Sequence, residues 1–443
     1  MNKVLSFLKT PVKLIPYLLL PVTFIFWAVI LRSDFLYVLK WWIVLLFIGF
    51  LFFPVSFNIF PTFTDKGFIF SKTIGLAISS YVFWLLSYLK LLKITSFNCW
   101  FVTAEVGVML SAVSLARNGG LKRFRSYFDE DSVTWILTGE SILLFSLCFW
   151  TYLRGFNPSI LGLEKFMDYG FVNSILRSGY VPPKDMWFAG GSINYYYFGH
   201  YISAFLTRLS GIATEISYNL MMATLFAVSM ALCFTIVSNM LKGHGILKKT
   251  PVITGGLVAS LLVCLGGNLH SFFYGFLAKF TKDGDKYWFP DATRYIGYNP
   301  ETDDKTIHEF PVYSYVVSDL HAHVINMIFV LTLIGILLAI FRKLQMRTNQ
   351  EFTARNRFEE LFLPEMALTA LFICIFQMSN YWDFPIYLTV TLFVLLCAGI
   401  RQYGFSKRTA ADTVIRFFAV LVLSMLFALP FNLSFDQIAS QIR

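Results

Sequence analysis

Apolar runs long enough to cross a lipid bilayer recur from one end of this 443-residue sequence to the other. A transmembrane helix needs roughly 20 mostly apolar residues, and by that rule the sequence predicts about eleven spans. They lie near residues 13–31, 41–61, 72–92, 97–116, 133–153, 217–240, 250–272, 322–342, 362–379, 384–400 and 413–432. Hydrophobic residues make up 57% of the chain and charged residues only 14%, which leaves too little polar sequence for a sizeable water-soluble domain. We therefore expect an all-α fold, a polytopic bundle of membrane helices.

The basic residues predict how this bundle is oriented. A net charge of +10 could suggest binding to nucleic acid, but the basic residues gather in alternate connections, as the positive-inside rule requires. The basic segments are the amino terminus and residues 117–125, 242–249, 342–357 and 401–408. We expect these on the cytoplasmic side of the plasma membrane, and the loops at 154–216, 273–321 and 379–384 outside. Lys90 and Lys93 are exceptions, because they fall on the outer side.

Three features inside the predicted spans refine this topology. The first span follows several lysines, as in a signal peptide, but its length and the lack of a small-residue cleavage pattern favour a retained helix. The six cysteines all fall in spans without CxxC spacing, which indicates packing residues rather than disulfides or metal ligands. Glu105 and Glu140 also lie within spans, and because a charge is costly there we expect both to face the bundle interior.

The first outer loop contains an amphipathic helix with two acids. From Leu163 to Ile175, apolar or small residues recur with the i, i+3, i+4 spacing of one helical stripe. Such a helix is expected to lie along the membrane surface. Glu164 and Asp168 are four residues apart, which places both carboxylates on its polar face. Simple solvation, or pairing with Lys165, is the alternative explanation for Asp168.

The same loop continues into three consecutive tyrosines, in the stretch "NYYYFGHY". The segment 195–209 is too short and too interrupted to cross the membrane. Tyr196 and Tyr197 precede His200 by four and three residues, so all three can share one helical face. An aromatic belt at the headgroup level would explain the tyrosines alone. Asn194 and His200 favour a functional site, because a belt needs neither.

The second outer loop ends in "SDLHAH", residues 318–323. Asp319, His321 and His323 alternate, so all three point the same way in an extended segment, whereas on a helix only Asp319 and His323 share a face. A carboxylate with imidazoles suits a divalent metal such as Mn, Mg or Zn. Alternatively, Ser318 or Asp319 caps the next span and the histidines are interfacial. The two explanations are compatible.

The third outer connection carries "NYWDFP", residues 380–385. Asn380 and Asp383 mark the entrance of a span, and Pro385 falls near its first turn. Capping of the helix by Asp383 is the simplest explanation.

Taken together, the motifs "EKFMD", "VPPKDMWFAGGSINYYYFGH", "SDLHAH" and "NYWDFP" resemble the YYY membrane protein family of archaea and bacteria, named for its tyrosine triplet. The resemblance covers Phe145 to Pro430. This family in turn resembles, more distantly, the class C glycosyltransferases. That resemblance implies a class C-like core, residues 133–443, with interfacial helices in its first large outer loop. Residues 1–132 are expected to form a four-span amino-terminal segment that lies outside the minimal core of those enzymes. The chain departs from the pattern where "NYYYFGH" replaces a Tyr-Pro-x-Gly-like stretch.

The resemblance also implies a function. The expected activity is that of an integral membrane hexosyl or pentosyl transferase of the cell envelope, which moves a sugar from a polyprenyl-phosphate donor to an acceptor on the outer face. Asp168 would be the catalytic base, with Glu164 as its neighbour or alternate, and Asp319, His321 and His323 would hold a divalent metal or the phosphate. The substrate-binding candidates are Asn194, Tyr195, Tyr196, Tyr197, His200, Arg177, Asp185, Trp187, Asn380, Trp382 and Asp383, and Arg208 is a further candidate for the lipid phosphate. The expected partners are this donor and membrane lipids, with no nucleic acid.

Two other function classes stay open. A transporter or lipid flippase would use the outer motifs as a gate and Glu105 and Glu140 along a path, and inverted repeats or broken helices would favour it. We find no convincing repeat in the sequence. A non-catalytic subunit of an envelope-assembly complex is the third class, in which the acids would be dispensable.

Overall fold

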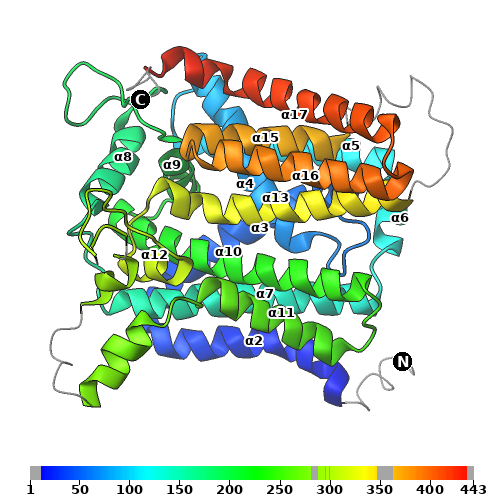
Figure 1. Ribbon diagram of the computed structural model, residues 1–443, viewed down its shortest axis with the longest axis horizontal. Coiled ribbons are helices and arrows are strands. Elements are labelled where there is room, and N and C mark those ends of the chain that lie inside the picture. Colours follow the sequence, from blue (N-terminus) through cyan, green and yellow to red (C-terminus); the bar gives the residue numbers. More distant parts are fainter. Residues whose placement is uncertain (1–10, 281–287, 295, 299, 347–362, 437–443) are drawn as a thin grey trace.

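The computed structural model describes residues 11–280, 288–294, 296–298, 300–346 and 363–436 (Figure 1). These residues form helices and connecting loops, with no β-strand among them. The long helices are α2 (Pro11–Leu31), α3 (Phe35–Ile59), α4 (Phe68–Tyr88), α5 (Ser96–Arg117), α7 (Glu130–Gly155), α10 (Thr214–Gly243), α11 (Lys249–Cys264), α13 (Ala322–Met346), α15 (Pro364–Ser379), α16 (Asp383–Tyr403) and α17 (Lys407–Ser434). Each predicted span overlaps one of them, which confirms an all-α, polytopic membrane protein.

Length and composition mark eight stretches of the described residues as candidate membrane spans. One is the 45-residue stretch Ile15–Ile59, which contains most of α2 and all of α3. The apolar helices α11 and α15 are shorter, at 16 residues each. A total of about eleven crossings, estimated from span length, therefore stays a prediction. The division at residue 132 and the class C-like core stay predictions as well.

The predicted span 250–272 is wrong at its carboxyl-terminal end. α11 ends at Cys264, and Gly266 and Gly267 follow it. Adjacent glycines disfavour continuation of a helix. The apolar residues beyond them form a short π-helix, η2 (Ser271–Phe276), and a 3-10 helix, η3 (Leu277–Phe280), whose aromatic side chains are largely exposed.

Polar side chains fix where two of the long helices begin. Thr95 accepts a hydrogen bond of 3.2 Å from the backbone N–H of Asn98 at the start of α5. Asp129 accepts one of 2.8 Å from the N–H of Ser132 at the start of α7. Each N-cap satisfies an amide that has no partner in the first helical turn. These caps set where α5 and α7 start relative to the neighbouring helices.

The long helices run side by side, with α10 near the centre (Figure 1). In the most apolar window of α10, 94% of the residues are buried, against 28% in α16 and in α17. α10 packs against α7 and α11, α3 packs against α4, and α15 packs against α17. All six cysteines are free and, as predicted, pack in the core, except for Cys397, which is exposed. The peripheral helices thus present apolar surface to the lipid.

The described basic connections and the motif-bearing segments lie at opposite ends of this bundle (Figure 1). The predicted basic residues 1–10 and 347–357 lie outside the described residues. The short basic helix α6 (Gly120–Ser126) lies at one end, together with the connections from α10 to α11 and from α16 to α17. The short helices α8 (Lys165–Arg177), α9 (Phe198–Ser210) and α12 (Pro311–Val317) lie at the other. This separation agrees with the expected topology, and the cytoplasmic location of the basic end stays a prediction.

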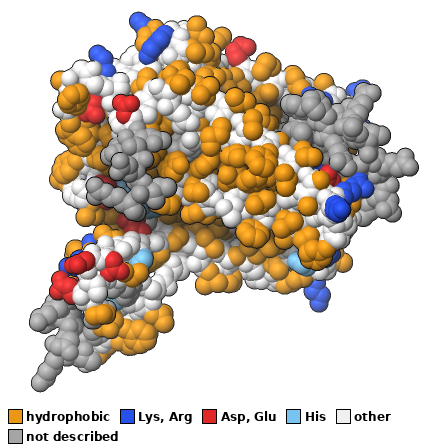
Figure 2. Space-filling view, turned by 45° about the horizontal axis from the view of Figure 1, so that its top comes forward, with side chains coloured by type: hydrophobic (Ala, Val, Ile, Leu, Met, Phe, Trp, Pro, Cys, Tyr) orange, Lys and Arg blue, Asp and Glu red, His pale blue; other side chains and the backbone are white. Residues whose placement is uncertain are grey.

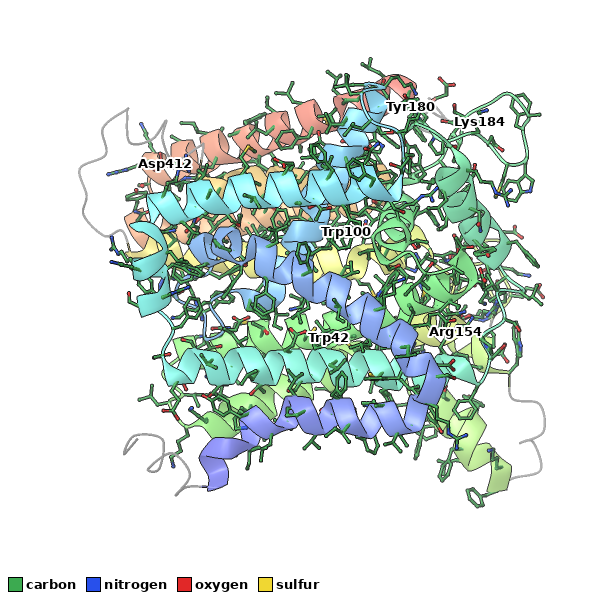
Figure 3. All side chains as sticks on the ribbon, turned by 180° about the vertical axis from the view of Figure 1, so that it is seen from behind. Trp42, Trp100, Arg154, Tyr180, Lys184 and Asp412 are labelled. Carbon is green, nitrogen blue, oxygen red and sulfur yellow. The ribbon has the colours of Figure 1, made fainter. Side chains whose placement is uncertain are left out.

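A charged pair lies inside the bundle. Lys72 Nζ is 2.6 Å from Glu140 Oε2, and the two side chains are 1% and 3% exposed. Trp42, which Figure 3 shows between α3 and α7, donates a hydrogen bond of 2.8 Å from Nε1 to Glu140 Oε1. Glu140 therefore faces the interior, as expected. The same expectation is wrong for Glu105, which is exposed, because α5 packs through the stripe that contains Thr103 and Gly107.

Candidate functional site

Helix α8 carries the acid motif across the end of the bundle (Figure 1). Its buried residues, which form one stripe at helical spacing, are Lys165, Asp168, Phe171, Val172 and Ile175. The amphipathic helix is thus confirmed. Asp168 nevertheless belongs to the buried stripe, whereas the Glu164 side chain, just before the first turn, is 61% exposed. The prediction that both carboxylates share a polar face is wrong, because Asp168 points into the packing between α8 and α9.

Asp168 forms a buried pair with His200 of α9. Asp168 Oδ1 lies 2.9 Å from His200 Nε2, and both residues are completely buried. The ring of Phe171 packs edge-on against the imidazole, with 5.3 Å between ring centroids. Asp168 Oδ2 and His200 Nδ1 have no hydrogen-bond partner among the described residues. Because polar groups in an apolar setting interact strongly, this contact fixes α8 against α9.

Lys165 joins α8 to the "SDLHAH" segment. Lys165 Nζ lies 3.0 Å from Asp319 Oδ1, and the two side chains are 8% and 6% exposed. The contact is an ion pair outside hydrogen-bond geometry. The backbone N–H of Glu164 points to Asp319 Oδ2 at 3.5 Å. Burial raises the pKa of Asp319 above its ordinary value, although Lys165 and His321 act in the opposite direction. Lys165 therefore pairs with Asp319 and not with Asp168.

Two further carboxylate–histidine contacts lie beside this ion pair. His321 Nε2 is 3.1 Å from Glu164 Oε2 and 3.8 Å from Asp319 Oδ2. His323 Nε2 is 3.1 Å from Glu309 Oε2, which also accepts a hydrogen bond from Ser314. Burial raises the pKa of Glu309, but the contacts with His323, Ser314 and His321 together outweigh it, so the net shift is downward. These contacts join the start of α8 and residues 309–314 to the "SDLHAH" segment.

Glu309, His321 and His323 could hold a metal ion. One ligand atom from each lies within 4.8 Å of the other two. The predicted set contained Asp319 in place of Glu309. Asp319 is engaged by a lysine, whose positive charge opposes a cation at the same oxygens. A carboxylate with two imidazoles fits zinc or another divalent transition metal.

Tyr218 of α10 holds the backbone of the "SDLHAH" segment in place. Its hydroxyl donates to the carbonyl of Ser318 at 3.3 Å and accepts from the N–H of Leu320 at 3.1 Å. Ser318 ends α12 with a φ of 60°, a left-handed conformation that turns the chain toward α13. The alternative in which Ser318 or Asp319 caps the next span is therefore wrong, since α13 begins at Ala322.

The three tyrosines point in different directions. All three precede α9, which begins at Phe198. The prediction that Tyr196 and Tyr197 share a helical face with His200 is therefore wrong. Tyr195 lies near His200, with 6.5 Å between ring centroids, and burial raises its pKa, with Asp168 and Glu164 adding to the effect. Tyr196 stacks on Tyr381 at 6.1 Å. Tyr197 is buried in the core and accepts a hydrogen bond from Trp84 at 3.1 Å. The triplet is not an exposed belt.

The "NYWDFP" residues lie at the edge of the cluster. Asp383 Oδ2 accepts a hydrogen bond of 2.8 Å from Asn326 of α13. Burial raises the pKa of the Asp383 carboxyl, although the side chains of Asn326, Asn380 and His323 act in the opposite direction. Asp383 is thus engaged with side chains rather than capping α16, whose N-cap residue Trp382 is 74% exposed.

Other predicted residues lie away from the cluster. Arg177 and Asp185 line a separate cavity of about 500 Å³ on the other side of α8, and Trp187 is 69% exposed. Asn194 forms two hydrogen bonds, of 2.9 and 3.0 Å, with the backbone of Asp436. Arg208 donates to the carbonyl of Leu176. The described residues between α11 and α12 form a lobe that stands off the main body (Figure 2). Acidic and histidine side chains lie beside the recess between this lobe and the main body.

Sequence reasoning missed three residues of the cluster. Lys165 was considered only as a partner of Asp168, and Glu309 and Tyr218 were not considered at all. A search for acids in the same outer loop as "SDLHAH" would have found Glu309 among several others. No signal marks Tyr218, because it lies within an apolar span.

The family to which this chain belongs follows from a comparison with known proteins. No curated protein and no solved structure matches it. A family model described as an uncharacterized membrane protein (DUF2298) matches residues 78–443, most of the chain and all of the cluster at the motif-bearing end. The chain therefore belongs to this family of membrane proteins.

Proposed function

We propose that the chain is an integral membrane glycosyltransferase that moves a sugar from a polyprenyl-phosphate donor to an acceptor at the motif-bearing end of the bundle. The observation that carries this proposal is the exposed Glu164 carboxylate, held 3.1 Å from His321 and next to the Lys165–Asp319 pair. An accessible acid at the end of a membrane bundle can meet both a lipid-linked donor and a polar acceptor. The resemblance of the motifs to class C enzymes supports the same assignment, as an analogy.

Glu164 is the residue that we assign to the reaction itself. As the acceptor oxygen bonds to the anomeric carbon of the sugar, the Glu164 carboxylate takes the proton of the acceptor hydroxyl. The bond between the anomeric carbon and the phosphate oxygen breaks, and its electron pair leaves with polyprenyl phosphate. His321 positions the Glu164 carboxylate for this transfer.

Asp168, the other predicted catalytic acid, has a positioning role in this proposal. It is completely buried and contacts His200, so it acts by fixing α8, which begins next to Glu164. Tyr195 covers this pair and offers an aromatic surface beside Glu164 on which a sugar ring can pack.

Glu309, His321 and His323 fit a divalent metal, as described above. When bound, such a metal would offset negative charge on the leaving phosphate. The protein's own contribution is to hold these ligands by fixed contacts, with Ser314 bonded to Glu309 and Tyr218 bonded to the backbone before His321.

The test is a transfer assay in proteoliposomes with radiolabelled polyprenyl-phosphate sugars. Glu164→Gln should lower the transfer rate at least about 100-fold, the contribution of a general base. Glu301→Gln is the matched control, because Glu301 is an exposed acid of the same end whose ion pair among the described residues is with Lys305. Full transfer by Glu164→Gln would remove the assignment of the base. No transfer by the parent chain with any donor in the series would overturn the function.

A further inference from the structure

A cavity of about 730 Å³ opens at the motif-bearing end, between the bend that joins α2 to α3 and the facing ends of α7 and α10. The bend is a single 3-10 turn, η1 (Arg32–Asp34). The inner wall of the cavity includes the buried apolar side chains of Leu31, Val38 and Leu220. The volume falls within the range of about 300–1,000 Å³ that is usual for ligand sites.

Arg154 supplies a buried cation to this cavity. The residue is 8% exposed, and Figure 3 shows it at the end of the bundle beside α3. Its guanidinium donates to the carbonyls of Asn157 and Ser159, the latter at 3.0 Å. Arg154 Nε has no partner among the described residues. Asp319 lies close enough to interact with the guanidinium electrostatically, but does not pair with it. A buried guanidinium with donors to spare favours an anionic ligand.

Two further buried polar atoms in the cavity wall lack partners among the described residues. They are Thr151 Oγ1, a donor or acceptor, and Asn219 Oδ1, an acceptor. The amide nitrogen of Asn219 already donates to the carbonyls of Pro158 and Glu215, so its orientation is fixed. Because buried polar groups are normally hydrogen-bonded, these atoms indicate a ligand that both accepts and donates.

The charges at the rim differ from those inside. Arg32, Asp34 and Glu215 line the opening and are exposed, so two carboxylates and one cation surround the entrance. Around them, exposed apolar side chains such as Val29 and Ile30 lie on the surface of α2 that faces lipid. A ligand with its negative charge at Arg154 and a positive or donor group at the rim matches this arrangement.

We propose that the cavity binds the headgroup of a zwitterionic phospholipid. The phosphate lies against Arg154 and Thr151, the ammonium group lies among Asp34, Glu215 and Asn219, and the acyl chains run along α2. Phosphatidylethanolamine has this chemistry. The site is a lipid-binding site and does not depend on the proposed sugar transfer, because its test measures binding.

The test uses the purified full chain, stripped of lipid in detergent, and measures binding by native mass spectrometry. The probes are dioleoyl phosphatidylethanolamine, dioleoyl phosphatidylglycerol, dioleoylglycerol and inorganic phosphate. We expect the ethanolamine lipid to bind most tightly, and Arg154→Gln to weaken its binding at least about tenfold, as expected for the loss of a charge-assisted hydrogen bond. Lys93→Gln is the control, because Lys93 is an exposed cation of the same end outside the cavity.

A second variant covers the case in which Arg154→Gln fails to fold. Ser33→Trp fills the cavity from its exposed edge without removing a buried group, and should also weaken binding at least about tenfold by excluding the headgroup. Unchanged binding in the folded variants would overturn the site. If dioleoylglycerol bound as tightly as the ethanolamine lipid, the role of the phosphate would be overturned. If phosphatidylglycerol bound as tightly, the role of the rim acids would be overturned. If inorganic phosphate bound and none of the lipids did, the assignment to a lipid would be overturned.

Discussion

The buried pair between Lys72 and Glu140 allows a direct test of how the bundle is held together. The two charged atoms are 2.6 Å apart, and neither side chain is more than 3% exposed. Trp42 bonds to the second carboxylate oxygen, and Lys72 Nζ also lies 4.1 Å from the centroid of the Phe68 ring. We consider the single variants Lys72→Met and Glu140→Leu and their combination.

The expected magnitudes follow from these contacts. Removal of one partner leaves the other charge buried and unpaired, which costs about 3–5 kcal/mol of the free energy of unfolding. Glu140→Leu leaves Lys72 only the face of Phe68, whereas Lys72→Met leaves Glu140 only Trp42. The double variant leaves neither charge of this pair, and its remaining cost is the unpaired N–H of Trp42, about 1–3 kcal/mol. The two single effects should therefore be strongly non-additive, with a coupling of at least about 3 kcal/mol.

The measurement is unfolding in mixed detergent micelles, followed by circular dichroism. Lys242→Met is the control, because its partner Asp131 is 39% exposed and such pairs contribute only about 0–1 kcal/mol. Additive single effects would refute the interpretation of the pair as a structural contact. If Glu140 served a transport path instead, the double variant would be stable but inactive, whereas a structural pair predicts that it keeps the activity of the parent.

Three further predictions concern the candidate site. Asp168→Leu leaves the imidazole of His200 without its partner and should cost about 1–3 kcal/mol of stability in a thermal unfolding assay, whereas Asp168→Asn should cost less; equal stability of Asp168→Leu and the parent would contradict the buried contact. Calorimetric titration of the metal-free chain should show zinc binding that His323→Ala weakens at least about tenfold, and an unchanged affinity would exclude the cluster. Because the pKa of Glu309 is lowered, the stability gained from its contacts is present above the ordinary pKa of 4.5 and is lost as the pH falls further. Glu309→Gln should therefore remove this part of the loss of stability in acid. An unchanged dependence of stability on pH in this variant would contradict the prediction.

The architecture could be predicted from the sequence because a bilayer imposes one length on every span. Apolar length located each long helix, and the basic connections that the structure describes lie together at one end. The helical stripe of α8 was also visible, since amphipathic spacing is a local property. The error at the end of α11 came from counting apolar residues across Gly266 and Gly267, although such a pair disfavours a helix.

The geometry of the site could not be predicted to the same depth. Spacing placed Glu164 and Asp168 on one face, but which part of α8 packs against α9 depends on the tertiary structure, and that packing buries only Asp168. The ion pair of Lys165 with Asp319 joins residues far apart in the chain. Glu309 lies in the same outer loop as His321 and His323, but spacing alone does not distinguish it from the other acids of that loop, so Asp319 was predicted in its place.

The tyrosine triplet shows how such distant segments are brought together. The backbone before α9 is not helical, so consecutive side chains diverge and each tyrosine packs against a different element. Tyr195 packs against Phe171 of α8, Tyr196 against Tyr381 before α16, and Tyr197 against Trp84 of α4. A surface belt would require none of these contacts and would tolerate any order of aromatic residues. Three tyrosines in sequence instead connect the acid helix, the third outer connection and the bundle core at one point, next to the Asp168–His200 pair. The triplet therefore determines the geometry of the site by joining its segments.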